Sequence, residues 1–299
     1  MTTIPGLHHV TAIAGSAQAN LQFFTTVLQQ RLVKKTVNFD APDTYHLYYG
    51  DQQGSPGTIL TFFPFAGAQP GRAGPGMASA YAYTVPRAAF DGWVAQATDG
   101  ASVTERFGAR VLTLRDPDGA PVELIEGDTP ATRIGGFHSV TLWEADIAPT
   151  ARLLTDVFGY AETAHETIGG VERLRLTAPG QAIGNIVDLI RTPGALPGRS
   201  GAGTIHHVAY RARNDAEQAA WIDTLARAGH RTTPVIDRQY FNAIYFREPG
   251  GVLFEIATDQ PGFATDEPAE TMGQALMLPA QHEHLRATLQ KVLPPLVAA

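Results

Sequence analysis

The chain contains no cysteine among its 299 residues. This absence excludes disulfide bonds, iron-sulfur clusters and thiolate zinc sites, so any metal ion must be held by histidine, carboxylate or other oxygen ligands. Long basic runs are also lacking, and the formal net charge is −7. An acidic chain without a basic segment disfavours a nucleic-acid partner and favours a small-molecule ligand.

Long hydrophobic runs are missing as well. No stretch approaches the roughly 18 consecutive apolar residues of a membrane span, and the opening residues 1–5 lack the basic and apolar regions of a signal peptide. We therefore expect a cytoplasmic protein without a membrane partner. A length of 299 residues with 44% hydrophobic and 17% charged composition favours two globular domains.

What the sequence does contain is an internal repeat. Four modules with the order strand, helix and three strands (βαβββ) are predicted at residues 6–65, 78–127, 135–191 and 203–258, followed by a tail at 259–299 that includes a short helix. Apolar residues at helical spacing place the helices of the first and fourth modules at 17–28 and 215–228. The prediction is an α+β fold in which paired modules form two domains with half-open sheets that cup a site.

The first, third and fourth modules begin with similar sequences, which differ at one aligned position. His9 and His207 share a position that Ser139 occupies in the third module, as the alignment of Val10, Val140 and Val208 shows. A purely structural histidine has no reason to be replaced in one copy only. The asymmetry therefore points to a functional site.

A second repeat, in which residues 116–125 match residues 248–257, supplies an acidic partner. Glu255 lies in the apolar strand 252–257, where an unpaired carboxylate would cost several kcal/mol of desolvation. It follows His207 by 255 − 207 = 48 residues, which is the span from the first to the last strand of one module. Two imidazoles and one carboxylate form the facial triad typical of non-haem Fe(II) oxygenases. We predict that His9, His207 and Glu255 bind one metal ion, which requires the first and fourth modules to pair around it.

Further candidates surround this triad. Strand alternation places Thr11 on the face of His9 and turns the neighbouring His8 and His206 away, so that these two either reach the rim of the site or simply pack. Arg238 and Tyr245 precede the Glu255 strand and could orient a phenolate or stabilise charge, although an arginine on a loop is often only solvated.

Other titratable residues fit the site less well. Glu123 occupies the column of Glu255 in the second module, but that module opens without a histidine, so a structural role is expected. His46, His138 and His165 lie outside the matched column and are not expected to be ligands.

The motifs His-His-Val-Thr at 8–11, His-His-Val-Ala-Tyr at 206–210 and Pro-Gly-Gly-Val-Leu-Phe-Glu at 249–255 together resemble the vicinal oxygen chelate superfamily. More narrowly, nearly the whole chain resembles its hydroquinone ring-cleaving dioxygenases. The resemblance implies a mononuclear Fe(II), with Mn(II) as the alternative, at the positions of the predicted triad. It also implies that the residues around the metal are His8, Thr11, His206, Arg238 and Tyr245. Catechol enzymes of the superfamily take their first histidine from the third module, which here has Ser139.

The expected function is therefore an Fe(II)-dependent dioxygenase that opens the ring of a hydroquinone or a related dihydroxylated aromatic with dioxygen. Two alternatives keep the same fold: a glyoxalase-like metal-dependent lyase or isomerase, and a non-catalytic protein that binds an aromatic compound and confers resistance. The expected partners are a small aromatic substrate and dioxygen. A homo-oligomer is an expectation that rests on the family resemblance alone.

Overall fold

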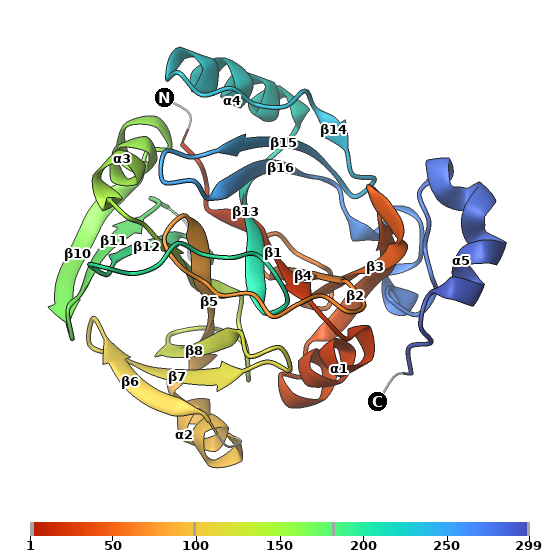
Figure 1. Ribbon diagram of the computed structural model, residues 1–299, viewed down its shortest axis with the longest axis horizontal. Coiled ribbons are helices and arrows are strands. Elements are labelled where there is room, and N and C mark those ends of the chain that lie inside the picture. Colours follow the sequence, from red (N-terminus) through yellow and green to blue (C-terminus); the bar gives the residue numbers. More distant parts are fainter. Residues whose placement is uncertain (1–2, 98–99, 181–182, 298–299) are drawn as a thin grey trace.

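The computed structural model describes residues 3–97, 100–180 and 183–297, which form two curled mixed sheets of eight strands each (Figure 1). The first sheet has the order β14 (Ile236–Asp237), β15 (Phe241–Arg247), β16 (Leu253–Pro261), β13 (Thr204–Ala212), β1 (Leu7–Ala14), β4 (Ile59–Pro64), β3 (Ala41–Gly50) and β2 (Arg31–Asn38). The second has the order β10 (Ala161–Ile168), β11 (Val171–Thr177), β12 (Ile186–Arg191), β9 (Phe137–Trp143), β5 (Met77–Pro86), β8 (Pro121–Gly127), β7 (Ala109–Arg115) and β6 (Ser102–Arg106).

This strand order joins modules that are distant in the sequence. The first and fourth modules share one sheet through the antiparallel pair β1 and β13, and the second and third share the other through β5 and β9. The predicted α+β class with paired βαβββ modules is confirmed. The last strand of the fourth module, β16, continues to Pro261, past the expected module end at 258.

Helices lie on the outer side of the curled sheets (Figure 1). The helix of the first module begins as α1 (Ala17–Gln22) and continues as a π-helical turn over Phe23–Val27, within the range that the apolar spacing predicts. In the fourth module, the side chain of Asn214 caps α4 (Asp215–Arg227) by accepting a hydrogen bond from the backbone N–H of Glu217. The other modules contribute α2 (Arg87–Gln96) and α3 (Ile147–Arg152).

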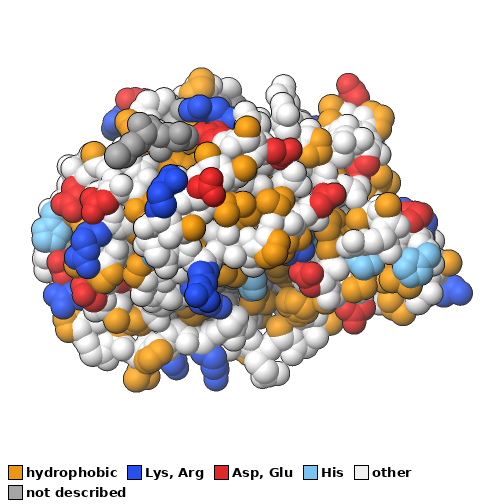
Figure 2. Space-filling model, turned by 90° about the horizontal axis from the view of Figure 1, so that it is seen from above, with side chains coloured by type: hydrophobic (Ala, Val, Ile, Leu, Met, Phe, Trp, Pro, Cys, Tyr) orange, Lys and Arg blue, Asp and Glu red, His pale blue; other side chains and the backbone are white. Residues whose placement is uncertain are grey.

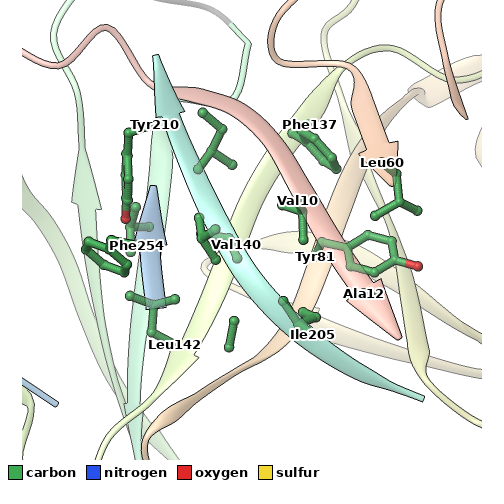
Figure 3. Close-up of a cluster of buried hydrophobic side chains, with 14 of the residues drawn as sticks. Val10, Ala12, Leu60, Tyr81, Phe137, Val140, Leu142, Ile205, Tyr210 and Phe254 are labelled. Carbon is green, nitrogen blue, oxygen red and sulfur yellow. The ribbon is translucent and has the colours of Figure 1, made fainter. Parts of the chain in front are cut away.

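The hydrophobic core lies between the two sheets (Figure 3). Val10 of β1 and Val140 of β9 are fully buried there, and burial of each such side chain stabilises the fold by about 1.5–3 kcal/mol. Side chains alternate along a strand, so the neighbours His9 and Thr11 point to the opposite, concave face of the first sheet. Packing of the core thereby fixes which side chains face the site.

The tail after β16 packs against the first module. It contains short 3-10 turns at Phe263–Thr265, Ala269–Thr271 and Ala280–Leu285, and it ends in α5 (Arg286–Val292). The backbone N–H of Met277 donates to the carbonyl oxygen of Lys35 on β2.

The surface is mixed in charge, because acidic and basic side chains are interspersed over the face shown in Figure 2. Within the described ranges, no helix has the length and apolar character needed to cross a bilayer.

Candidate metal centre

Three side chains converge on the concave face of the first sheet. His9 comes from β1, His207 from β13 and Glu255 from β16, three strands that lie side by side in the sheet. The Nε2 atom of His207 lies 2.9 Å from Oε2 of Glu255, and the Nε2 atom of His9 lies 3.4 Å from the same oxygen and 3.4 Å from Nε2 of His207. The three side chains are at most 6% exposed. The predicted ligands are therefore brought together at one point.

The chemistry of this cluster suits a metal ion. Glu255 is fully buried, and no arginine or lysine among the described residues forms an ion pair with its carboxylate, whose Oε2 atom instead lies 2.9 Å from His207 and 3.4 Å from His9. Burial opposes ionisation of Glu255, but the neighbouring His9 and His207 outweigh it and hold the pKa of this carboxyl below its usual range. Burial also lowers the pKa of His207, which favours the neutral imidazole that binds metals. A buried carboxylate that faces two imidazole nitrogens, with no arginine or lysine of the described chain to neutralise it, suggests a divalent cation at their centre.

The other ring nitrogen of each imidazole is also held. Nδ1 of His9 lies 2.9 Å from Nδ1 of His8, and Nδ1 of His207 lies 2.7 Å from Nδ1 of His206. If Nε2 offers its lone pair to a cation, the proton of the neutral ring is on Nδ1 and is donated to the neighbouring histidine. Burial lowers the pKa of His8 to about 3 and that of His206 to about 4, so both neighbours are neutral and able to accept. Such outer partners fix the orientation of a ligand ring.

Simple strand alternation did not predict these neighbouring contacts. The ladder between β1 and β13 passes from the pair Leu7 and Tyr210 to the pair His9 and Ala209, so His8 has no partner. On the other strand His206 is skipped in the same way. Each histidine pair thus lies at a β-bulge, where two residues face one and the side-chain direction departs from period 2.

A cavity of about 230 Å³ opens beside the cluster. The three predicted ligands line it, together with His206, Arg238 and Tyr245 of the residues predicted around them. The Nε atom of Arg238 donates to the Tyr245 hydroxyl at 3.2 Å, and its Nη1 atom donates to Asp40 at 3.1 Å. Burial, together with the charge of Glu255, raises the pKa of Tyr245 well above 10.0. The tyrosine is therefore protonated at neutral pH.

Thr11 lies behind the cavity wall. It is fully buried, and its hydroxyl is 2.8 Å from that of Thr61. Thr61 in turn bonds Nε2 of His46, whose Nδ1 atom bonds the Tyr48 hydroxyl, both at 2.8 Å. Because both nitrogens of His46 are engaged by the protein, this histidine is a wall residue, in agreement with its exclusion as a ligand.

Sequence reasoning did not single out several wall residues. Asn38 is the last residue of β2, Phe39 and Asp40 form the turn before β3, and Phe63 and Phe241 add aromatic surface. The only available signal was the abundance of aromatic residues near the ends of these strands, which core packing explains equally well.

The family follows from comparison with known proteins. The model of the Glyoxalase/Bleomycin resistance protein/Dioxygenase superfamily matches residues 6–124 and 136–256. The chain belongs to this superfamily. Two structures of glyoxalase I from Zea mays, both 14% identical in sequence, share the fold. One superposes with a TM-score of 0.62 over 85% of this chain and 92% of the glyoxalase chain. The E144Q mutant superposes with a TM-score of 0.63.

Closer relatives match over the full length. The "Putative ring-cleaving dioxygenase MhqO" of Bacillus subtilis (strain 168) is 45% identical over 97% of this chain and 96% of its own. The chlorohydroquinone/hydroquinone 1,2-dioxygenase of Sphingobium indicum is 32% identical, with 97% and 96% covered. A crystal structure of a "putative dioxygenase" from Bacillus subtilis subsp. subtilis str. 168 superposes with a TM-score of 0.93 at 43% identity, covering 100% of this chain and 99% of the other.

Proposed function

We propose that this protein is an Fe(II)-dependent dioxygenase that opens the ring of a hydroquinone with dioxygen. The observation that carries the proposal is the buried cluster of His9, His207 and Glu255, which lies beside an aromatic cavity and whose carboxylate forms no ion pair with an arginine or lysine of the described chain. Full-length similarity to a chlorohydroquinone/hydroquinone 1,2-dioxygenase supports the substrate class.

A ferrous ion held by three protein ligands would supply the redox chemistry that an aromatic diol needs to react with dioxygen. His9, His207 and Glu255 would hold it. His8 and His206 would keep the two ligand imidazoles in the required tautomer and orientation through the Nδ1 contacts.

The cavity walls would select and orient the substrate. A volume of about 230 Å³ is below the range of roughly 300–1,000 Å³ that is usual for drug-sized ligands, which favours a single aromatic ring. Phe39, Phe63 and Phe241 provide apolar surface for the ring and its substituents.

Polar groups in the same wall would manage charge and protons. Tyr245 and Arg238 lie where a phenolic oxygen near the ligand cluster would be met, so the guanidinium would stabilise a phenolate and the protonated tyrosine would donate a hydrogen bond to it. His206 lines the cavity; because its Nδ1 atom accepts from His207, its Nε2 atom carries the proton of the neutral ring and would donate a hydrogen bond to a substrate oxygen.

The direct test is anaerobic reconstitution with Fe(II), followed by oxygen-electrode measurements with hydroquinone, chlorohydroquinone and catechol. We expect oxygen uptake that depends on a hydroquinone, and a ring-opened product whose mass includes both atoms of ¹⁸O₂. A parallel reconstitution with Mn(II) identifies the active metal. Absence of oxygen uptake with every diol and both metals would refute the proposal.

A further inference from the structure

One turn of the chain presents side chains to both sides of the cavity wall. Within residues 238–241, Arg238 and Phe241 line the cavity, whereas Gln239 and Tyr240 are bonded to a residue of the C-terminal tail. The turn is tight, because the N–H of Arg238 donates to the carbonyl of Phe241 and the N–H of Tyr240 donates to the carbonyl of Arg238. Gln239 has a φ of 66°, in the left-handed region that non-glycine residues rarely adopt.

A conformation of this kind persists only when its surroundings hold it. Two carboxylates hold it: Oδ1 of Asp237 accepts from the backbone N–H of Gln239 at 2.6 Å, and Oδ2 of Asp266 accepts from Nε2 of Gln239 at 2.8 Å and from the hydroxyl of Tyr240 at 2.9 Å. Asp266 is the one that comes from outside the turn, and it anchors the side chains. Its Oδ1 atom lies 2.6 Å from Nζ of Lys34 on β2, a lysine that is fully buried and also contacts Glu267 at 2.6 Å. The buried ammonium group of Lys34 thus fixes the carboxylate of Asp266, and this carboxylate holds the turn at residues 238–241.

The same tail segment supports the cavity wall by packing. Phe263 stacks on Tyr240 with ring centroids 5.2 Å apart, and it lies 5.1 Å from Tyr48 and 6.5 Å from Phe241. Tyr48 and Phe241 both line the cavity. The tail therefore supports the site from behind its wall, through lining residues such as Tyr48 and Phe241 and through the turn that contains Arg238.

We infer that Asp266 is a positioning residue: by holding Gln239 and Tyr240 it directs Arg238 across the cavity toward Tyr245 and Asp40. The inference rests on the proposed function for the nature of the ligand. Arg238 is the only arginine or lysine among the lining residues that the structure describes, so its direction determines where the cavity presents positive charge. A turn freed from Asp266 would leave Arg238 with several competing directions and weaken its contact with a substrate oxygen.

The test removes the two hydrogen bonds from the side of the turn, in the double variant Gln239→Ala/Tyr240→Phe. This change leaves the buried pair of Asp266 and Lys34 intact, so the variant should fold. We expect about a 10-fold weaker affinity for hydroquinone, measured by anaerobic calorimetry on the iron-loaded protein, and a comparable loss in kcat/KM. Iron content and the urea unfolding midpoint should match those of a control variant.

The control is Gln29→Ala/Tyr81→Phe. Gln29 is an exposed glutamine that also has a left-handed φ, of 54°, and Tyr81 is a buried tyrosine whose hydroxyl has no hydrogen-bond partner in the described residues. Neither lines the cavity. A loss of hydroquinone affinity in the control equal to that in the test variant would overturn the inference, because it would show a nonspecific effect.

A double-mutant cycle separates positioning from general damage. In an Arg238→Met background, the Gln239→Ala/Tyr240→Phe change should have no further effect on hydroquinone affinity. An equal 10-fold loss in that background would overturn the inference, since the effect would not pass through Arg238. The binding cycle does not depend on turnover: a protein that binds hydroquinone without oxygen uptake would refute the proposed reaction and still decide the role of Asp266.

Discussion

The two sheets share one topology but use their concave faces differently. Each contains the same bulges in its central strand pair, which skip His8 and His206 in the first sheet and Ser79 and His138 in the second. The two sheets differ at two other aligned positions: the one that follows the skipped residue, and the acid column, which is the position on the last strand of each module that Glu255 occupies in the fourth. In module order, the first of these contains His9, Ala80, Ser139 and His207, and the second contains Thr61, Glu123, Asp188 and Glu255.

In the second sheet, arginines of the chain itself neutralise the buried acids. Arg106 makes two hydrogen bonds of 2.7 Å to Glu123. Arg175 bonds Asp188 at 2.8 and 2.9 Å, and Arg173 lies 3.3 Å from the same carboxylate. The space that corresponds to the metal centre is thus filled by ion pairs.

In the first sheet, the equivalent acid has no such partner. No arginine or lysine in the described chain forms an ion pair with Glu255, whose carboxylate lies against the imidazoles of His9 and His207. The comparison teaches that this fold places a carboxylate at one column and requires a cation to meet it. The second sheet supplies this cation as arginine side chains. The first sheet supplies none from its described residues, so its carboxylate is suited to a bound metal ion.

The largest effect is expected from breaking the acid column of the first sheet. Glu255→Ala should reduce bound iron below one tenth of the wild-type content and lower ring cleavage by at least about 100-fold, because even outer partners of metal ligands cost 10- to 100-fold. Elemental analysis and oxygen uptake measure both. Full iron content in this variant would contradict the assignment of the ligand.

The matched change in the second sheet should affect stability instead. Glu123→Gln leaves the guanidinium of Arg106, only 11% exposed, without its carboxylate. We expect a loss of about 3–5 kcal/mol in the free energy of unfolding, measured by urea denaturation, with iron content and kcat unchanged. The double variant Arg106→Met/Glu123→Leu should recover much of this loss. A selective loss of activity would show that the two faces are not functionally separate.

Removal of the metal should destabilise the first sheet more than the second within the same molecule. A chelator should destabilise the wild type by about 3 kcal/mol if iron is present at roughly 100 times its dissociation constant. Hydrogen exchange should accelerate in β1, β13 and β16, while β5 and β9 keep their protection. Equal acceleration in both sheets would mean that the cation does not act locally.

The sequence predicts the triad because its members recur in register. His9, His207 and Glu255 occupy columns that the repeats align, and period-2 alternation puts all three on one face. The modules and the α+β class follow from the same repeat. Alternation fails at His8 and His206, since a bulge adds a residue to one strand and leaves no mark in the hydrophobic pattern.

The residues that complete the site were beyond this kind of reasoning. Asp40 and His46 have no repeated counterpart, and Asp266 lies in a tail that follows the last module. Their positions depend on loop geometry and on contacts between segments distant in the sequence, such as Lys34 with Asp266. Pattern and spacing specify strands and faces, whereas contacts of this kind require coordinates.

The smallest effect concerns the junction of the two sheets, where Glu144 follows β9 and packs against Gly250 in the turn before β16. The Glu144 side chain is fully buried, and neither of its carboxyl oxygens has a hydrogen-bond partner among the described residues. Burial, reinforced by the charge of Glu248, raises the pKa of Glu144 from 4.5 to about 9. Between these pH values the folded state keeps a proton that the unfolded state releases, so stability falls as pH rises through this window. Glu144→Gln should therefore exceed the wild type by about 1–3 kcal/mol at pH 9 and match it near pH 5 in urea unfolding. An equal difference at both pH values would show that Glu144 does not titrate at the junction and that the sheets meet there through packing alone.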